Sequence, residues 1–147
     1  MDPLTHIWLT RRVVGTNPTI VLAGMMADAP FYLTYPVWVV KQGQLKQALQ
    51  THEWHRPPAE KGHHAFHSLP LLGLAALLVR WRNGRFPRRF FYAWALHILV
   101  DLPTHSRRQW APQFLWPFSS ITMDGVSWID WLMRALHGAR GQQNRSK

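Results

Sequence analysis

The chain has 147 residues, with 17 lysines and arginines against 7 aspartates and glutamates, 9 histidines and no cysteine. This length predicts a single domain, and 47% of hydrophobic residues is enough for a packed core. The absence of cysteine excludes disulfide scaffolds, thiolate zinc sites, iron–sulfur clusters and cysteine nucleophiles, so any metal would be held by histidine and carboxylate alone. The net charge of +10 predicts an anionic partner: phosphate, nucleic acid or an acidic membrane surface.

Tryptophan is unusually frequent, with 9 residues, and tryptophan together with arginine is typical of a membrane–water interface. Four apolar stretches, 13–27, 29–40, 68–79 and 90–100, are each closed by a charge or interrupted by proline. None of them is an uncharged run of the roughly 18–20 residues that a simple spanning helix needs. Segment 1–12 has no clean apolar core and does not resemble a cleavable signal peptide. We therefore expect peripheral or shallow association with a membrane surface, through tryptophan and arginine.

Apolar periodicity and helix-boundary signals predict an all-α fold, a compact bundle of five to six helices. It forms one domain over residues 1–137 and is followed by a basic, flexible tail over 138–147. In the first half of the chain, Asn17 and Pro18 indicate the cap and first turn of a helix that continues through 19–27.

Prolines and charged turns divide the rest of the chain. Pro30 and Pro36 are expected to break or kink the segment that follows the first helix. The remaining expected elements are a short polar helix over 42–50, a loop over 51–62, a helix over 63–81 that properly starts near Pro70, a basic turn over 82–89, an apolar helix over 90–102 stopped by Pro103, an irregular segment over 104–120 and an amphipathic helix over 124–137.

His97 and Asp101 stand four residues apart in an apolar stretch, which places both on one face of a helix. A carboxylate buried there without a partner would be costly, and a cation or a protonated histidine would offset that cost. Two interpretations stay open: a shared metal ion, or a hydrogen-bonded pair that braces the core. Asp28 also interrupts an apolar region, and it is either a ligand or the N-cap of a helix that begins directly after it.

Three histidines lie within five residues, at positions 63, 64 and 67. His63 and His67 are four apart and His64 and His67 three apart, so either pair fits a metal-binding face of a helix. The alternative is a solvated, histidine-rich loop. His6 alone is typical of a surface residue, and His105 is ambiguous. Histidine and aspartate without sulfur suit zinc or manganese, in a site of one or two ions.

Several short motifs occur in a recognisable order. They are Thr5-His6, the stretch Ala-Gly-Met-Met-Ala-Asp over 23–28, Phe66-His67-Ser68-Leu69, His97-x-x-x-Asp101-x-x-Thr104-His105 and Leu-Trp-Pro-Phe-Ser over 115–119. Together they resemble the bacterial inner-membrane-associated, metal-dependent hydrolases, a family that includes proteins described as LexA-binding. In ligand order the chain is also distantly similar to the all-helical zinc-dependent phospholipase C and P1-type nuclease group.

The resemblance implies a divalent metal site, with zinc as the first candidate and manganese as the second. The ligands that it implies are His6, Asp28, His67, His97 and Asp101. The chain departs from the family pattern in two places: an acidic residue and a histidine are missing after Asp28, and Gly62 stands where the family has a histidine. The candidates to replace that histidine are His63, His64 and, from the preceding loop, His55. These departures imply either one metal fewer or a member that has lost its activity.

Two functions are consistent with these residues. The first is a metal-dependent hydrolase of an anionic ester, of the phosphodiester or phospholipid class, associated with the bacterial inner membrane, with His64 or His105 moving the proton. The second is a non-catalytic, basic, tryptophan-rich protein that binds anionic lipid or a partner at the membrane. Nucleic-acid binding would rest on charge alone, since no recognised motif accompanies it, and we do not expect it.

Overall fold

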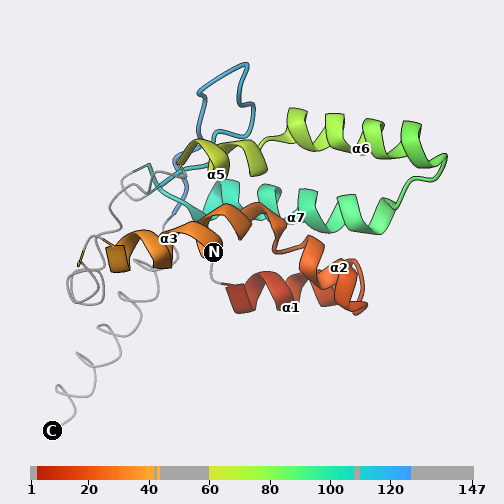
Figure 1. Ribbon diagram of the computed structural model, residues 1–147, viewed down its shortest axis with the longest axis horizontal. Helices are drawn as coiled ribbons and strands as arrows, with labels where there is room; N and C mark the ends of the chain where they lie inside the picture. Colours follow the sequence, from red (N-terminus) through yellow and green to blue (C-terminus); the bar gives the residue numbers. More distant parts are fainter. Residues whose placement is uncertain (1–2, 42, 44–59, 108–109, 127–147) are drawn as a thin grey trace, which may run out of the picture.

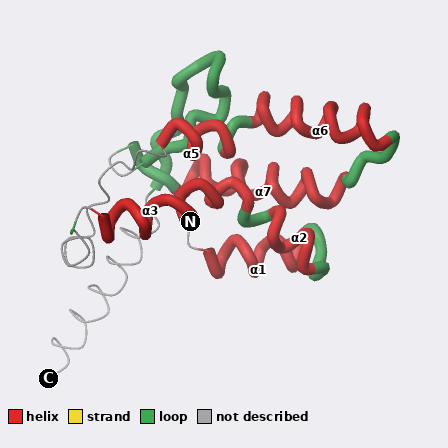
Figure 2. Tube along the Cα trace, viewed as in Figure 1, coloured by secondary structure: helices red, strands yellow, loops and turns green. Residues whose placement is uncertain are grey.

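The computed structural model describes residues 3–41, 43, 60–107 and 110–126 (Figure 1). Within this part of the chain the fold is all-α, as predicted, with no strand (Figure 2). The elements are α1 (Pro3–Val13), α2 (Pro18–Ala23), the 3₁₀ turn η1 (Met26–Asp28), α3 (Ala29–Lys41), α5 (Glu60–Phe66), α6 (Leu69–Asn83) and α7 (Arg88–Thr104).

Helix α7 is the centre of the fold. It contacts α1, α2, η1 and α6, and in Figure 1 it runs between α6 and the α1–α2 pair. The hydrophobic core is built around Ala27, Leu72, Phe91 and Ile98, so it joins η1 and α6 to α7. The buried face of α7 also carries two polar residues toward its C-terminal end, and these belong to the site described below.

The first predicted helix begins where expected and ends earlier. The side chain of Asn17 accepts a hydrogen bond from the Thr19 N–H at 2.9 Å, which caps α2. The helix ends at Ala23 rather than at residue 27, because Gly24 is buried directly against α1. A Cβ atom at position 24 would collide with the side chain of Thr10. The chain therefore turns at Gly24 and continues as η1.

The expected helix over 63–81 is in fact two helices. α5 ends at Phe66, and Ser68 has extended backbone angles and caps α6 by accepting from the Leu71 N–H at 3.2 Å. Pro70 lies in the first turn of α6, where a missing N–H costs nothing, so the predicted start near Pro70 is confirmed. Gly84 ends α6 in the left-handed conformation, with φ of 63°.

Three prolines expected to interrupt helices are accommodated inside them. Pro30 occupies the first turn of α3, where its missing N–H is not needed, and α3 runs on through Pro36 to Lys41. Pro103 was expected to stop the apolar helix, but α7 continues to Thr104, whose hydroxyl donates to the Val100 carbonyl at 2.9 Å.

Other predictions are corrected or lie outside the described residues. No helix was expected over 3–13, where α1 forms. The irregular segment is confirmed, because 105–107 and 110–126 contain no helix, and this includes the first three residues of the helix expected over 124–137. The rest of that helix, the helix over 42–50, most of the loop over 51–62 and the tail lie outside the described residues. Within those residues no helix is long and apolar enough to cross a membrane.

Candidate metal centre

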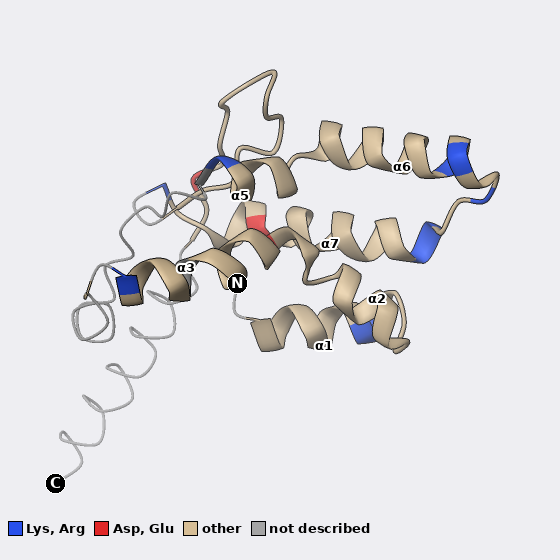
Figure 3. Cartoon of the chain, viewed as in Figure 1, with Lys and Arg blue, Asp and Glu red and all other residues tan. Residues whose placement is uncertain are grey.

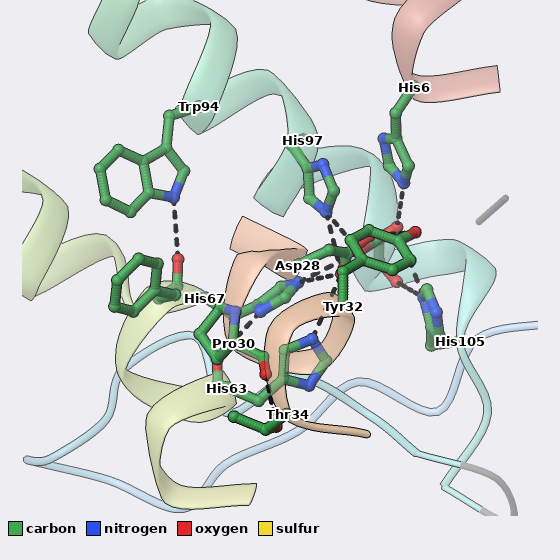
Figure 4. A network of polar contacts seen from close by, with 12 residues as sticks. His6, Asp28, Pro30, Tyr32, Thr34, His63, His67, Trp94, His97 and His105 are labelled. Atoms are coloured by element: carbon green, nitrogen blue, oxygen red, sulfur yellow. Dashed lines mark hydrogen bonds and ion pairs between the residues drawn. The ribbon is translucent and has the colours of Figure 1, made fainter. Parts of the chain in front are cut away.

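Four side chains from three parts of the chain meet in the interior beside α7. Asp28 comes from the end of η1, His67 follows α5 directly, and His97 and Asp101 lie one turn apart on α7 (Figure 4). One potential ligand atom from each lies within 4.8 Å of all the others, so this group could hold a metal ion. His67, His97 and Asp101 are fully buried, and the Asp28 side chain is 13% exposed. We call these four residues the metal centre.

The separations within the metal centre match those expected around a small ion. His67 Nε2 lies 3.6 Å from Asp28 Oδ1 and 3.3 Å from Asp101 Oδ2. His97 Nε2 lies 3.6 Å and 3.1 Å from the same two oxygens. Tetrahedral ligands at zinc-like bond lengths are roughly 3.3–3.6 Å apart. Three of the four separations fall in this range and the fourth, at 3.1 Å, is slightly shorter, so the four side chains are close enough together to bind one small ion.

Both histidines of the metal centre are oriented by backbone carbonyls. His97 Nδ1 lies 2.6 Å from the Gly24 carbonyl, and His67 Nδ1 lies 3.0 Å from the His63 carbonyl. A carbonyl oxygen can only accept, so each Nδ1 carries the hydrogen. Each Nε2 is left to face the carboxylates. This arrangement is the usual one for histidines that bind metals.

His97 supplies a further sign that a cation belongs here. Its Nε2 is buried and makes no aligned hydrogen bond within the described residues, although Asp101 Oδ2 is 3.1 Å away. In the neutral imidazole this nitrogen would turn a lone pair toward carboxylate oxygens. A proton or a metal ion is needed to convert that repulsion into attraction.

The ionisation of these groups follows from their burial together. Burial alone would raise the pKa of both carboxyl groups, but the surrounding imidazoles hold the pKa of Asp28 and of Asp101 below their usual range. Burial would lower the pKa of His97, but the two carboxylates raise it to about 9. Burial lowers the pKa of His67 to about 4. Two carboxylates and one imidazolium thus leave the metal-free centre with a net negative charge, which favours a divalent cation.

His6 and His105 lie on the other side of Asp101. His6 Nε2 is 3.1 Å and His105 Nδ1 is 3.5 Å from Asp101 Oδ1, the oxygen that faces away from His67 and His97. His6 is 1% exposed and its ring stacks on His97 at 3.7 Å, so its interpretation as a surface residue is wrong. His105 Nδ1 is also 3.1 Å from the Asp101 carbonyl, and burial lowers the pKa of its imidazole.

Asp28 is held from two sides by side chains outside the metal centre. His63 Nε2 lies 3.2 Å from its Oδ1, and the Tyr32 hydroxyl donates to its Oδ2 at 3.3 Å. Both oxygens of Asp28 are therefore directed toward side chains. Within the described contacts, none joins Asp28 to a backbone N–H of α3, so the structure does not support the N-cap interpretation.

The histidine-rich segment is part of the interior. His63, His64 and His67 are each less than a tenth exposed, so the interpretation as a solvated loop is wrong. Neither His63 nor His64 belongs to the four-residue group. His64 stacks on the indole of Trp110 with ring centroids 5.8 Å apart. Neither the position of Trp110 at the site nor the orienting carbonyl of Gly24 follows from a local sequence pattern.

Comparison of the chain with protein-family models, curated proteins and solved structures found no match. The family resemblance therefore rests on the motifs alone. Two of those motifs touch in the structure: the Ser68 hydroxyl donates to the Trp116 carbonyl, and the Leu69 N–H donates to the Phe114 carbonyl at 2.9 Å. The Leu-Trp-Pro-Phe-Ser motif therefore helps to fix the backbone directly after His67.

Proposed function

We propose that this protein is a metal-dependent hydrolase of an anionic ester, of the phosphodiester or phospholipid class, with zinc as the first candidate ion and manganese as the second. The observation that carries the proposal is the close grouping of two imidazole nitrogens and two carboxylate oxygens, all within 4.8 Å of one another, in the interior of the protein. A bound divalent ion supplies an acidified water and a positive charge for a phosphoryl oxygen.

The residues around the metal centre have separate roles in this proposal. Asp28, His67, His97 and Asp101 hold the ion, while the backbone carbonyls of residues 24 and 63 keep the imidazoles in the ligating tautomer. His105 is the first candidate for proton transfer. Its Nδ1 donates to the Asp101 carbonyl, so the lone pair of the neutral imidazole is on Nε2, and its side chain is 18% exposed. His64 is the second candidate.

The test is metal analysis of protein purified without chelator, followed by removal and reloading with zinc or manganese. Stoichiometric binding, and hydrolysis of bis(p-nitrophenyl) phosphate that disappears with the metal, are the expected results. Asp101→Asn serves as the inactive control, so that a contaminating hydrolase would be recognised by activity that survives in it. A chain that binds neither ion after reloading would contradict the proposal.

A second candidate function is binding to an anionic membrane surface, and it is favoured by the α6–α7 hairpin. Leu74, Leu77, Leu78 and Trp81 lie on one face of α6 and are more than half exposed, with Trp81 at 85%. Five exposed arginines gather where α6 and α7 join (Figure 3). They are Arg80, Arg82, Arg85, Arg88 and Arg89. An apolar stripe beside clustered arginine and tryptophan suits the interface of a bilayer with anionic headgroups.

The two candidate functions are separable by experiment. Sedimentation with vesicles of phosphatidylcholine, with and without phosphatidylglycerol, measures the membrane function, and metal content measures the hydrolase function. A chain that binds the anionic vesicles and takes up no metal would be the non-catalytic membrane protein. A chain that does both would be a hydrolase working at a membrane surface.

A further inference from the structure

Trp110 covers one side of the metal centre. Its ring centroid lies 4.1 Å from that of His63, 4.9 Å from His67, 5.4 Å from His105 and 5.8 Å from His64. The backbone holds it there, because the Trp110 N–H donates to the Ser106 carbonyl at 3.1 Å, and the two residues that follow are buried. The indole is thus a fixed neighbour of the four imidazoles.

The indole N–H of Trp110 is a buried donor without an acceptor. Its Nε1 is inaccessible to solvent and makes no hydrogen bond within the part of the chain that the structure describes. Folded proteins pair almost all buried donors, because an unpaired one loses its hydration without compensation. Trp94 gives the contrast: its Nε1 donates to the Phe66 carbonyl at 2.9 Å (Figure 4).

Other N–H groups near the metal centre already donate hydrogen bonds to protein carbonyls. The Nδ1–H groups of His67 and His97 donate to backbone carbonyls. Arg107, which precedes Trp110 by three residues in the sequence, donates from its guanidinium to the Thr122 carbonyl at 2.7 Å. Phosphate oxygens that do not bind the metal ion carry negative charge, and fixed N–H donors in a buried site stabilise them.

We propose that the Trp110 indole N–H donates a hydrogen bond to an oxygen of the phosphate-like group that binds at the metal centre, so that Trp110 forms an anion subsite. This inference rests on the proposed function. It makes Trp110 a substrate-binding residue, with the indole ring also keeping water away from the imidazoles that it covers.

The test compares Trp110→Phe with Trp94→Phe, which removes a paired indole N–H from the same protein. The probe is inorganic phosphate, titrated calorimetrically into zinc-loaded protein, and metal affinity is measured separately with a chelating dye. Trp110→Phe should keep its metal affinity and bind phosphate about 10–100-fold more weakly, the usual loss for one hydrogen bond to a charged group. Its unfolding temperature should fall less than that of Trp94→Phe, because the smaller ring loses packing in both variants but Trp110→Phe loses no protein hydrogen bond.

Trp94→Phe should behave in the opposite way, with a lower unfolding temperature and unchanged phosphate affinity. Equal phosphate affinity in Trp110→Phe and wild type would overturn the subsite and leave the hydrolase proposal standing. Loss of metal together with phosphate in Trp110→Phe would overturn it too, because Trp110 would then act only by supporting the ligands. Wild-type protein that takes up neither zinc nor manganese would overturn the hydrolase proposal, and the subsite with it.

Discussion

Asp101 lies between two pairs of histidines and contacts both. One carboxylate oxygen faces His67 and His97, and the other faces His6 and His105. Asp101→Asn keeps the shape but removes the charge, and the neutral amide oxygen is a much weaker zinc ligand than a carboxylate. We expect it to abolish zinc binding while the far-ultraviolet circular dichroism keeps its helical signal. Full metal occupancy in this variant would show that the ligand set is wrong.

The three neighbouring histidines should differ in importance. His67→Ala removes a ligand and should cost metal affinity the most. His63→Ala removes no ligand, but it removes the contact with Asp28 and the ring contacts with His67 and Trp110, for which a loss of about 10–100-fold is expected. His64→Ala should cost no more than His63→Ala, because His64 lies outside the four-residue group. Competition with a chelating dye measures all three variants side by side, and equal, small losses would argue against a metal at this place.

Residue spacing alone could predict only the local contact of the metal centre, whereas Asp28 and His67 were implied as ligands by the family resemblance. His97 and Asp101 are four residues apart on one helix, so their proximity follows from helical geometry. His97 and Gly24 are 73 residues apart in the sequence, and no local sequence pattern predicts their contact. The burial of His6 was missed for the same reason, since it depends on how α1 packs against the α7 face that carries His97.

At the scale of the helices, the close approach of α1 to Gly24 should be critical. In Gly24→Ala the added Cβ meets the Thr10 side chain, so α1 or the turn must move. Such overpacking costs about 1–3 kcal/mol, and it also shifts the carbonyl that orients His97. We therefore expect both a lower free energy of unfolding in urea and weaker metal binding.

Gly73→Ala is the matched control for this prediction. Gly73 lies inside α6 and nothing comes within 4 Å of the position that a Cβ atom would take. Alanine is the better helix former by about 1 kcal/mol, so this variant should be at least as stable as wild type. If Gly24→Ala were equally stable, the packing of α1 on the turn would not matter for the site.

Helix boundaries set by local chemistry were predictable, and those set by packing were not. Asn17 and Pro70 correctly indicated where α2 and α6 begin, because caps and first-turn prolines act within a few residues. The predicted helix end at Pro103 was wrong, because the end of α7 depends on its packing against four other elements. The division between α5 and α6 was missed too, and it is this division that turns His67 toward α7.

For the whole molecule, the distribution of charge matters more than its sum. The chain carries a net charge of +10, yet the metal centre is negative, and residues 61–100 contain no aspartate or glutamate. The arginines at the end of the hairpin therefore lie far in sequence from any compensating acid. A cation is favoured in the interior, while anionic surfaces are favoured at the end of the hairpin.

This separation predicts that position, and not net charge, decides membrane binding. The double variant Arg85→Ser/Arg88→Ser removes two charges from the hairpin end, and Arg11→Ser/Arg12→Ser removes two exposed charges from α1. At about 1 kcal/mol for each arginine at an anionic surface, the hairpin variant should bind phosphatidylglycerol vesicles about 30-fold more weakly. The α1 variant, which has the same net charge, should lose much less, and both should bind zinc as the wild type does. Added salt should weaken wild-type binding in the same assay, because screening acts on exposed charges. Equal losses in the two variants would mean that the membrane responds only to total charge and that the α6–α7 hairpin is not the docking surface.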